Sequence, residues 1–187
     1  WINTRDPRWW WAIGAVAGVG MLNKYTLVFW AAGLLVALLL TPERRILATR
    51  WPWLAAMLGL LMLAPNLIWQ WQYHFPVVHH MSELAENQLN NVRTADFLLD
   101  QLLMPGPGGL LIWLAGLGFL LWHPVARAYR SVGLFYVAIV LIFLVLRGKS
   151  YYTIGAYPVL FAAGGVAWER WLKKVWQRVV LVLLLLV

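Results

Sequence analysis

Residues 132–166 read VGLFYVAIVLIFLVLRGKSYYTIGAYPVLFAAGGV, which is two apolar runs on either side of a short polar segment. The polar segment, residues 147–158, holds two cations, three tyrosines and two glycines. An unpaired charge deep in a bilayer costs about 2.5–3.5 kcal/mol even on lenient insertion scales, so these side chains belong at a membrane boundary or in a polar cavity. Cations beside phenol hydroxyls suit an anionic ligand with several oxygen acceptors, such as a phosphate. This segment, called the polar island below, is a candidate binding site.

The rest of the chain is equally apolar, since 63% of its 187 residues are hydrophobic and only 12% are charged. Several runs approach or exceed the roughly 18 apolar residues that span a bilayer. The sequence therefore predicts an all-α, polytopic transmembrane helix bundle forming one transmembrane domain over 1–187. We expect six crossings and a truncated seventh, at residues 10–22, 27–40, 52–71, 110–122, 131–146, 153–168 and 179–187.

Two features refine this organisation. The first predicted helix is rich in small residues that allow close packing on a neighbour, namely Gly14, Ala15, Ala17, Gly18 and Gly20. Residues 72–109 form the one long polar stretch, which we interpret as an outer loop with an amphipathic, interfacial helix at about 95–104. In that helix Asp96, Asp100 and Gln101 are expected on the polar side.

The net charge of +8 would suit a nucleic-acid-binding protein, but the cations fall mostly in short loops between apolar runs. We therefore interpret them as orienting the protein in a membrane, with no nucleic-acid partner. The predicted topology places 11 of the 15 Lys and Arg residues on one side, which the positive-inside rule makes cytoplasmic. Lys24, Arg93, Arg147 and Lys149 lie on the other side, together with the long loop and the polar island. The absence of cysteine excludes disulfides and thiolate metal sites.

Both ends of the sequence look cut. Residue 1 is Trp rather than Met, and the run at 179–187 has about half the length of a crossing. We expect the chain to be an internal piece of a larger protein.

Four short segments, in this order, carry a family resemblance: GVGMLNKYT at 18–26, PNLIWQ at 65–70, GKSYY at 148–152 and AYP at 156–158. Together they resemble bacterial glycosyltransferase family 39. The members of this family are membrane glycosyltransferases that depend on polyprenyl-phosphate sugars, and they are related to protein O-mannosyltransferases and lipid A aminoarabinose transferases. The resemblance extends over nearly the whole chain.

The resemblance implies a GT-C fold with a catalytic cavity on the outer-leaflet side of a bacterial inner membrane. It implies inverting transfer of a sugar from undecaprenyl phosphate to an acceptor glycan, lipid or protein, with the lipid-linked sugar as substrate, membrane lipid as surroundings and no cofactor. The family's catalytic Asp would precede Trp1, so we assign no catalytic residue here. The residues that match, or lie beside, the family's lipid-phosphate-binding positions are Lys24, Tyr25, Arg147, Lys149, Tyr151 and Tyr152.

Each candidate also has a simpler interpretation. Arg147 and Lys149 could snorkel to lipid headgroups, as any interfacial cation does. Lys24 has the stronger case, because it interrupts an apolar run that contains no other charge within ten residues on either side. His79, His80 and Glu83 have a spacing that would suit a metal on a helix, but no further ligand pair supports one, so we expect acceptor or sugar contact and no metal.

Two other classes of protein fit parts of the pattern. A transporter or flippase of a lipid-linked or anionic solute would use the same cations as a translocation path. It would also show internal repeats and polar residues in the middle of crossings, whereas here no repeat is evident and the polar groups gather at one face. A non-catalytic scaffold would tolerate neutralisation of Lys24 and Lys149. The enzyme is therefore the favoured hypothesis.

Overall fold

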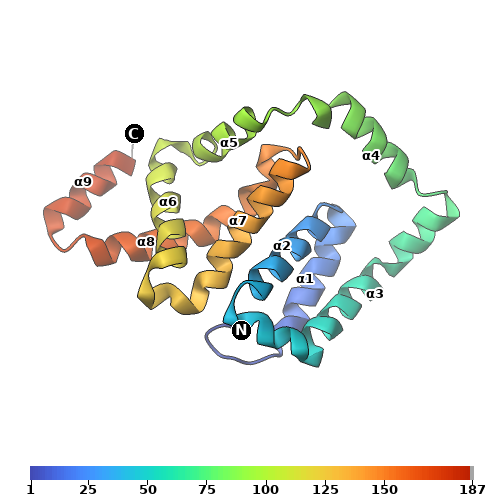
Figure 1. The fold of residues 1–187 in the computed structure, drawn as a ribbon, viewed down its shortest axis with the longest axis horizontal. Helices are drawn as coiled ribbons and strands as arrows, with labels where there is room; N and C mark the ends of the chain where they lie inside the picture. Colours follow the sequence, from blue (N-terminus) through green and yellow to red (C-terminus); the bar gives the residue numbers. More distant parts are fainter. Residues whose placement is uncertain (186–187) are drawn as a thin grey trace. The chain divides into compact units, whose positions relative to one another are not determined.

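The computed structural model describes residues 1–185, and in this range every regular element is a helix (Figure 1). The chain divides into two compact units, unit 1 from Trp1 to Asn91 and unit 2 from Val92 onward. The helical bundle predicted from the sequence is thus confirmed. The last two residues of the predicted segment 179–187 lie outside the described range.

Unit 1 contains α1 (Trp9–Asn23), α2 (Leu27–Leu39), the 3-10 helix η1 (Pro42–Ala48), α3 (Arg50–Gln72), α4 (Pro76–Asn87) and η2 (Leu89–Asn91). The main packing partner of α1 is α3 rather than α2. Gly14 and Gly18 make this contact, as the small-residue pattern predicts. A Cβ on Gly14 would lie 2.8 Å from Ala55 Cα, and one on Gly18 would lie 3.2 Å from Gly59 Cα, so the two backbones touch.

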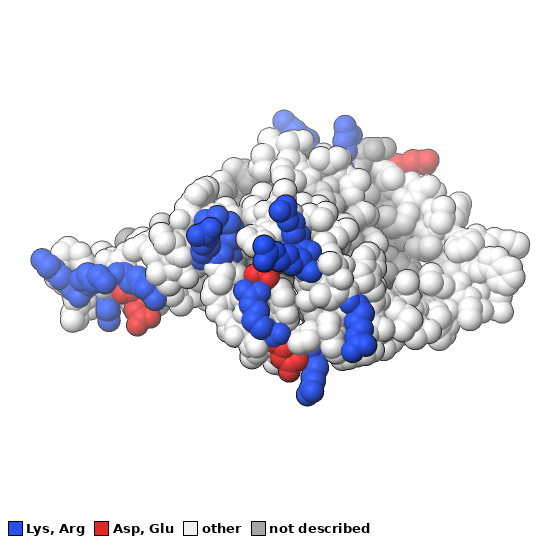
Figure 2. Space-filling view, turned by 60° about the horizontal axis from the view of Figure 1, so that its bottom comes forward, with Lys and Arg blue, Asp and Glu red and all other residues white. Residues whose placement is uncertain are grey.

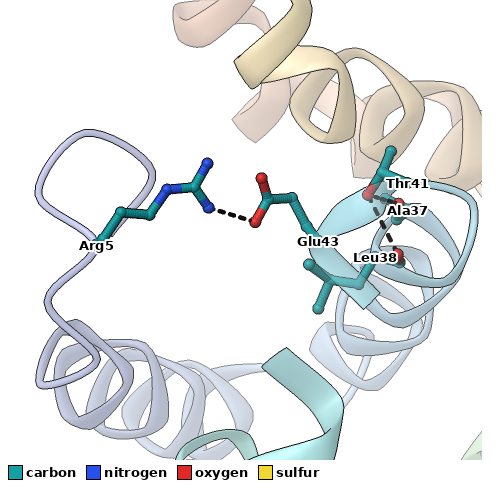
Figure 3. Close-up of polar contacts among 5 residues, drawn as sticks. All are labelled: Arg5, Ala37, Leu38, Thr41 and Glu43. Carbon is teal, nitrogen blue, oxygen red and sulfur yellow. Dashed lines mark hydrogen bonds and ion pairs between the residues drawn. The ribbon is translucent and has the colours of Figure 1, made fainter. Parts of the chain in front are cut away.

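The end of unit 1 where α2 stops is closed by polar contacts (Figure 3). The buried Thr41 hydroxyl lies 3.0 Å from Ala37 O and 3.2 Å from Leu38 O, and so adds a side-chain donor for the carbonyls in the last turn of α2. An ion pair of 2.6 Å joins Arg5 Nη1 to Glu43 Oε2 and ties the segment before α1 to η1. A core of Trp10, Leu38, Ile46 and Ala55 lies at this end.

The other end of α3 turns sharply into α4. His74 and Phe75 both have positive φ, 58° and 55°. Phe75 N donates to Gln70 O (2.6 Å) and His74 N donates to Trp71 O (3.3 Å), which is the hydrogen-bond pattern of a Schellman motif. The predicted outer loop at 72–109 thus contains the helix α4, whose histidines, serine and glutamates form a polar pattern typical of a solvated loop.

Unit 2 contains α5 (Thr94–Leu103), α6 (Gly106–Trp122), the 3-10 helix η3 (Pro124–Tyr129), α7 (Arg130–Val145), the 3-10 helix η4 (Ser150–Ala156), α8 (Tyr157–Trp171) and α9 (Val175–Leu185). Here α6 packs mainly on α8. A Cβ on Gly116 would lie 2.7 Å from Gly164 N, so these helices also meet backbone to backbone. Trp113, Tyr136 and Tyr157 form an aromatic cluster beside this contact, with ring centroids 5.7–5.9 Å apart.

Two described helical stretches are long and apolar enough to cross a membrane, Arg50–Gln72 and Pro124–Val145, and the number rises to four if each of two bent helix pairs is one span. From the sequence we expected six complete crossings and a truncated seventh. The difference arises from helix length: the 15 residues of α1 or of α8 extend about 22 Å at 1.5 Å per residue, less than the roughly 30 Å hydrocarbon core. Only 17% of the most apolar window of α3 is buried within the protein, as expected of a helix that faces lipid.

Charged side chains form separate groups on the protein surface. Figure 2 shows Lys and Arg side chains as separate blue groups on an otherwise uncharged face, with a few acidic side chains beside them. In unit 1, Arg5, Arg45 and Thr49 line a cavity of about 370 Å³ at the end where α2 stops. This is the end that the positive-inside rule assigns to the cytoplasm.

Candidate functional site

Lys24 lies in the turn between α1 and α2. Its backbone is extended (φ −155°, ψ 120°), and its amide donates to Gly20 O at 2.8 Å, which ends α1. The side chain is exposed. The predicted separation of two helices at this polar point agrees with the structure, in which α1 ends at Asn23 and α2 begins at Leu27.

Tyr25 connects this turn to the far end of α3. Its hydroxyl donates to Asn66 Oδ1 and accepts a hydrogen bond from Gln70 Nε2 at 2.9 Å. Gln70 is buried, and its Oε1 accepts from Val77 N of α4 at 3.2 Å. Two of the four segments that carry the family resemblance therefore meet inside unit 1. Because the Tyr25 proton is held by Asn66, Tyr25 would have to give up that bond to donate to a phosphate.

The polar island begins where α7 ends. Gly148 N donates to Phe143 O at 2.7 Å and Arg147 N donates to Leu144 O at 3.3 Å, which again is a Schellman motif. Arg147 occupies the left-handed position with φ 51°, where glycine is the usual residue. Gly148 is buried, and a Cβ there would lie 2.7 Å from Phe143 Cδ1. Arg147 is exposed and lines a small pocket with Thr94 and Phe97 of α5.

Lys149 follows at once and precedes η4, which carries Tyr151 and Tyr152. Lys149 is half-buried, Tyr151 is exposed, and the Tyr152 amide donates to Lys149 O at 3.0 Å. The Tyr152 ring lies 4.8 Å from Tyr151 and 5.3 Å from Phe143 between centroids. Burial, with a smaller contribution from a hydrogen bond with Tyr151, raises the pKa of Tyr152 to about 12. Tyr152 is therefore a neutral phenol at physiological pH.

The inner side of η4 is fixed by α5. Asp100 and Gln101 bond to Ser150, and Gln101 also bonds to Thr153 and Tyr157. The expectation that Gln101 lies on the polar side of its helix is wrong: it is only 4% exposed. Gln101 shares a face with the buried Phe97, which lies four residues earlier, one helical turn away. That spacing is the signal that could have identified it.

The predicted acceptor residues lie on α4. His79, His80 and Glu83 are all exposed, and His79 Nε2 lies 3.3 Å from Glu83 Oε1. Among the described residues, no group of three or more His, Asp or Glu side chains has a geometry that could hold a metal ion. What α4 contacts beyond the chain stays a prediction.

The structure groups the predicted residues by unit. In unit 1, the Lys24–Tyr25 turn lies at the same end as the junction of α3 and α4. In unit 2, the polar island lies at the same end as α5. Which side of a membrane each of these ends faces stays a prediction.

Comparison with known proteins adds independent evidence on the family. Residues 1–69 match the family model described as dolichyl-phosphate-mannose-protein mannosyltransferase. The matched range contains Lys24, Tyr25 and Asn66 and ends before the polar island. Searches of curated proteins and of solved structures found no match to the chain. The family match covers the first of the resembling segments and nearly all of the second, and it supports a membrane glycosyltransferase of the GT-C type.

Proposed function

We propose that the protein transfers a sugar from a polyprenyl-phosphate donor to an acceptor on the outer side of the membrane. In this proposal the polar island of unit 2 holds the phosphate of the lipid, Lys24 of unit 1 stays a predicted donor-binding residue, and the donor is a substrate rather than a cofactor. The family match supports the glycosyl transfer itself. The class of donor, the side of the membrane and the roles of individual residues are what we add.

The observation that carries the proposal is the left-handed backbone of Arg147. A non-glycine residue in this conformation is strained, and such strain persists where the surrounding structure or a function requires it. Glycine would relieve the strain at this position, yet the sequence keeps a cation there. Lys149, Tyr151 and Tyr152 follow within one turn, so two positive charges and two phenol hydroxyls occupy a short, well-ordered segment.

These groups suit the charge change of the reaction. When the bond between the sugar anomeric carbon and the phosphate oxygen breaks, an acceptor hydroxyl forms the new bond and gives its proton to a general base, and the lipid phosphate leaves with increased negative charge. Fixed cations near that oxygen stabilise the transition state more than the ground state. A neutral Tyr152 can donate its proton in a hydrogen bond to the phosphate, whereas a phenolate would repel it.

The exposed residues of α4 complete the proposal. His79, His80 and Glu83 offer donors and acceptors on a helix that starts at the same end of unit 1 as the Lys24 turn. We assign them to contact with the acceptor or with the transferred sugar. An acceptor can be a glycan, a lipid or a protein, since all three present hydroxyl groups.

The test uses the complete protein in liposomes, with a polyprenyl-phosphate sugar as donor. Replacing Lys149 by Ala should raise the KM for the donor and leave thermal stability nearly unchanged, because the side chain is half-exposed. Lys173→Ala is the matched control, since Lys173 is exposed on the predicted cytoplasmic side. An unchanged KM for Lys149→Ala would remove Lys149 from the site. Transfer from a nucleotide sugar instead of the lipid donor would refute the proposed donor class.

A further inference from the structure

The amide of Gln101 is buried and bonded at both of its ends. Nε2 donates to Ser150 O at 3.2 Å, while Oε1 accepts from the Thr153 hydroxyl at 2.6 Å and from the Tyr157 hydroxyl at 3.0 Å. Gln101, Thr153 and Tyr157 are 4%, 0% and 4% exposed. The Thr153 hydroxyl also lies 2.9 Å from Ser150 O, and the Tyr157 hydroxyl 3.0 Å from Gln101 O, so the Gln101 amide joins a buried network through both its donor and its acceptor.

Asp100, the preceding residue of α5, adds a second bond to the same target. Its Oδ2 accepts from Ser150 Oγ at 2.7 Å. Ser150 is thus held through its hydroxyl by Asp100 and through its carbonyl by Gln101 together with Thr153. A bond from a hydroxyl to a carboxylate is stronger than one between neutral groups.

Ser150 lies between Lys149 and Tyr151, which the proposed function places at the lipid phosphate. It is also the first residue of η4, a short 3-10 helix. Such helices have poor internal hydrogen-bond geometry, so outside contacts matter more for their conformation. The contacts of η4 come from α5, α7 and α8, and α5 supplies the polar ones named above.

We propose that Asp100 and Gln101 are positioning residues that hold the Lys149–Tyr152 turn in its donor-binding conformation. This inference rests on the proposed function. Neither residue needs to touch the donor. By fixing the turn before the donor arrives, they remove the loss of conformational freedom that binding would otherwise cost. The helix α5 thereby becomes part of the site although it carries no predicted ligand-binding residue.

The first test replaces Asp100, because its side chain is less buried than that of Gln101. In the complete protein, Asp100→Ala should raise the donor KM about tenfold or more, the effect of one lost charge-assisted hydrogen bond. Asp100→Asn keeps an oxygen that accepts from Ser150 and should restore most of the affinity. Asp96→Ala is the matched control, because Asp96 is an exposed acid on the same helix. Ser150→Ala should raise KM as Asp100→Ala does, and the double variant should be no worse than either single one.

A second test uses Gln101→Glu, which keeps an acceptor for Thr153 and Tyr157 but removes the donor to Ser150. It should raise donor KM more than it lowers kcat. A purely structural role predicts lower thermal stability with unchanged KM for the folded fraction, and that result would overturn the inference. If Lys149→Ala raises KM while the Asp100 and Gln101 variants do not, the positioning role fails and the proposed function stands. If Lys149→Ala has no effect either, Lys149 leaves the proposed site and the positioning role fails with it.

Discussion

Replacing Arg147 by glycine should make the protein more stable and its donor binding weaker. Arg147 has φ 51°, and a non-glycine residue in the left-handed region costs about 1–2 kcal/mol. Glycine recovers this energy but loses about 0.5–1 kcal/mol through the larger freedom of the unfolded chain. The expected net gain is therefore about 0.5–1 kcal/mol. For a chain of this size, that raises the melting temperature by about 1–4 °C.

The same variant should bind the donor more weakly. The loss of one exposed charge at the phosphate is expected to cost about 1 kcal/mol, or about fivefold in donor KM. Arg147→Ala separates the two effects, because alanine removes the charge and keeps the strain. Arg147→Lys keeps both the charge and the strain, so it should match the native protein in stability and bind the donor better than the Ala variant does.

Melting curves in detergent, followed by tryptophan fluorescence, and donor kinetics in liposomes provide the two readouts. If the Gly variant is no more stable than the Ala and Lys variants, the strain argument is wrong. If the Gly variant is more stable and keeps its donor KM, the charge of Arg147 has no part in the site. In that case the polar island would rely on Lys149 alone for positive charge.

Adjacent glycines of α8 should respond oppositely to alanine. A Cβ on Gly164 would lie 2.7 Å from Ile112 Cγ2 and 2.8 Å from Ile112 C, so Gly164→Ala should destabilise by about 1–3 kcal/mol in thermal unfolding. A Cβ on Gly165 would have no heavy atom within 4 Å, so Gly165→Ala should raise the free energy of unfolding by about 0.5–1 kcal/mol. At high pH, the raised pKa of Tyr152 means that the folded protein favours the neutral phenol. This contribution to stability is complete below the ordinary pKa of 10 and is lost as the pH rises towards about 12. Tyr152→Phe should lose less stability over that range, and equal losses would contradict the shift.

Helix positions could be predicted where a single local property of the sequence, such as a long apolar run, determines the structure. The long apolar runs predict helices, and the small residues at Gly14 and Gly18 predict a close helix contact, because no other side chain fits against a neighbouring backbone. The sequence does not reveal that the partner is α3. That choice depends on contacts between residues far apart in the chain, for which a local pattern holds no information.

The candidate ligand-binding residues are conspicuous in the sequence, whereas the residues that support them are not. Cations and tyrosines in an apolar sequence are conspicuous because burying them without a partner is costly. Gln101 was placed on the wrong side of its helix because a polar residue normally faces water, and its partners Ser150 and Thr153 lie some fifty positions later. The 3-10 helix before α8 was likewise read as the start of a crossing, since Thr153 and Ile154 continue the apolar pattern.

The pairing of α1 with α3 and of α6 with α8 bears on how the protein is made. In each unit the closest contact joins helices separated by another helix, and glycine lets their backbones meet. Synthesis proceeds from the amino terminus, so α1 leaves the ribosome before its main partner exists. Its glycine-lined side must face lipid or the insertion machinery until α3 has been made. Substitutions at Gly14 or Gly18 should therefore affect a late step of assembly, leaving the insertion of α1 itself intact.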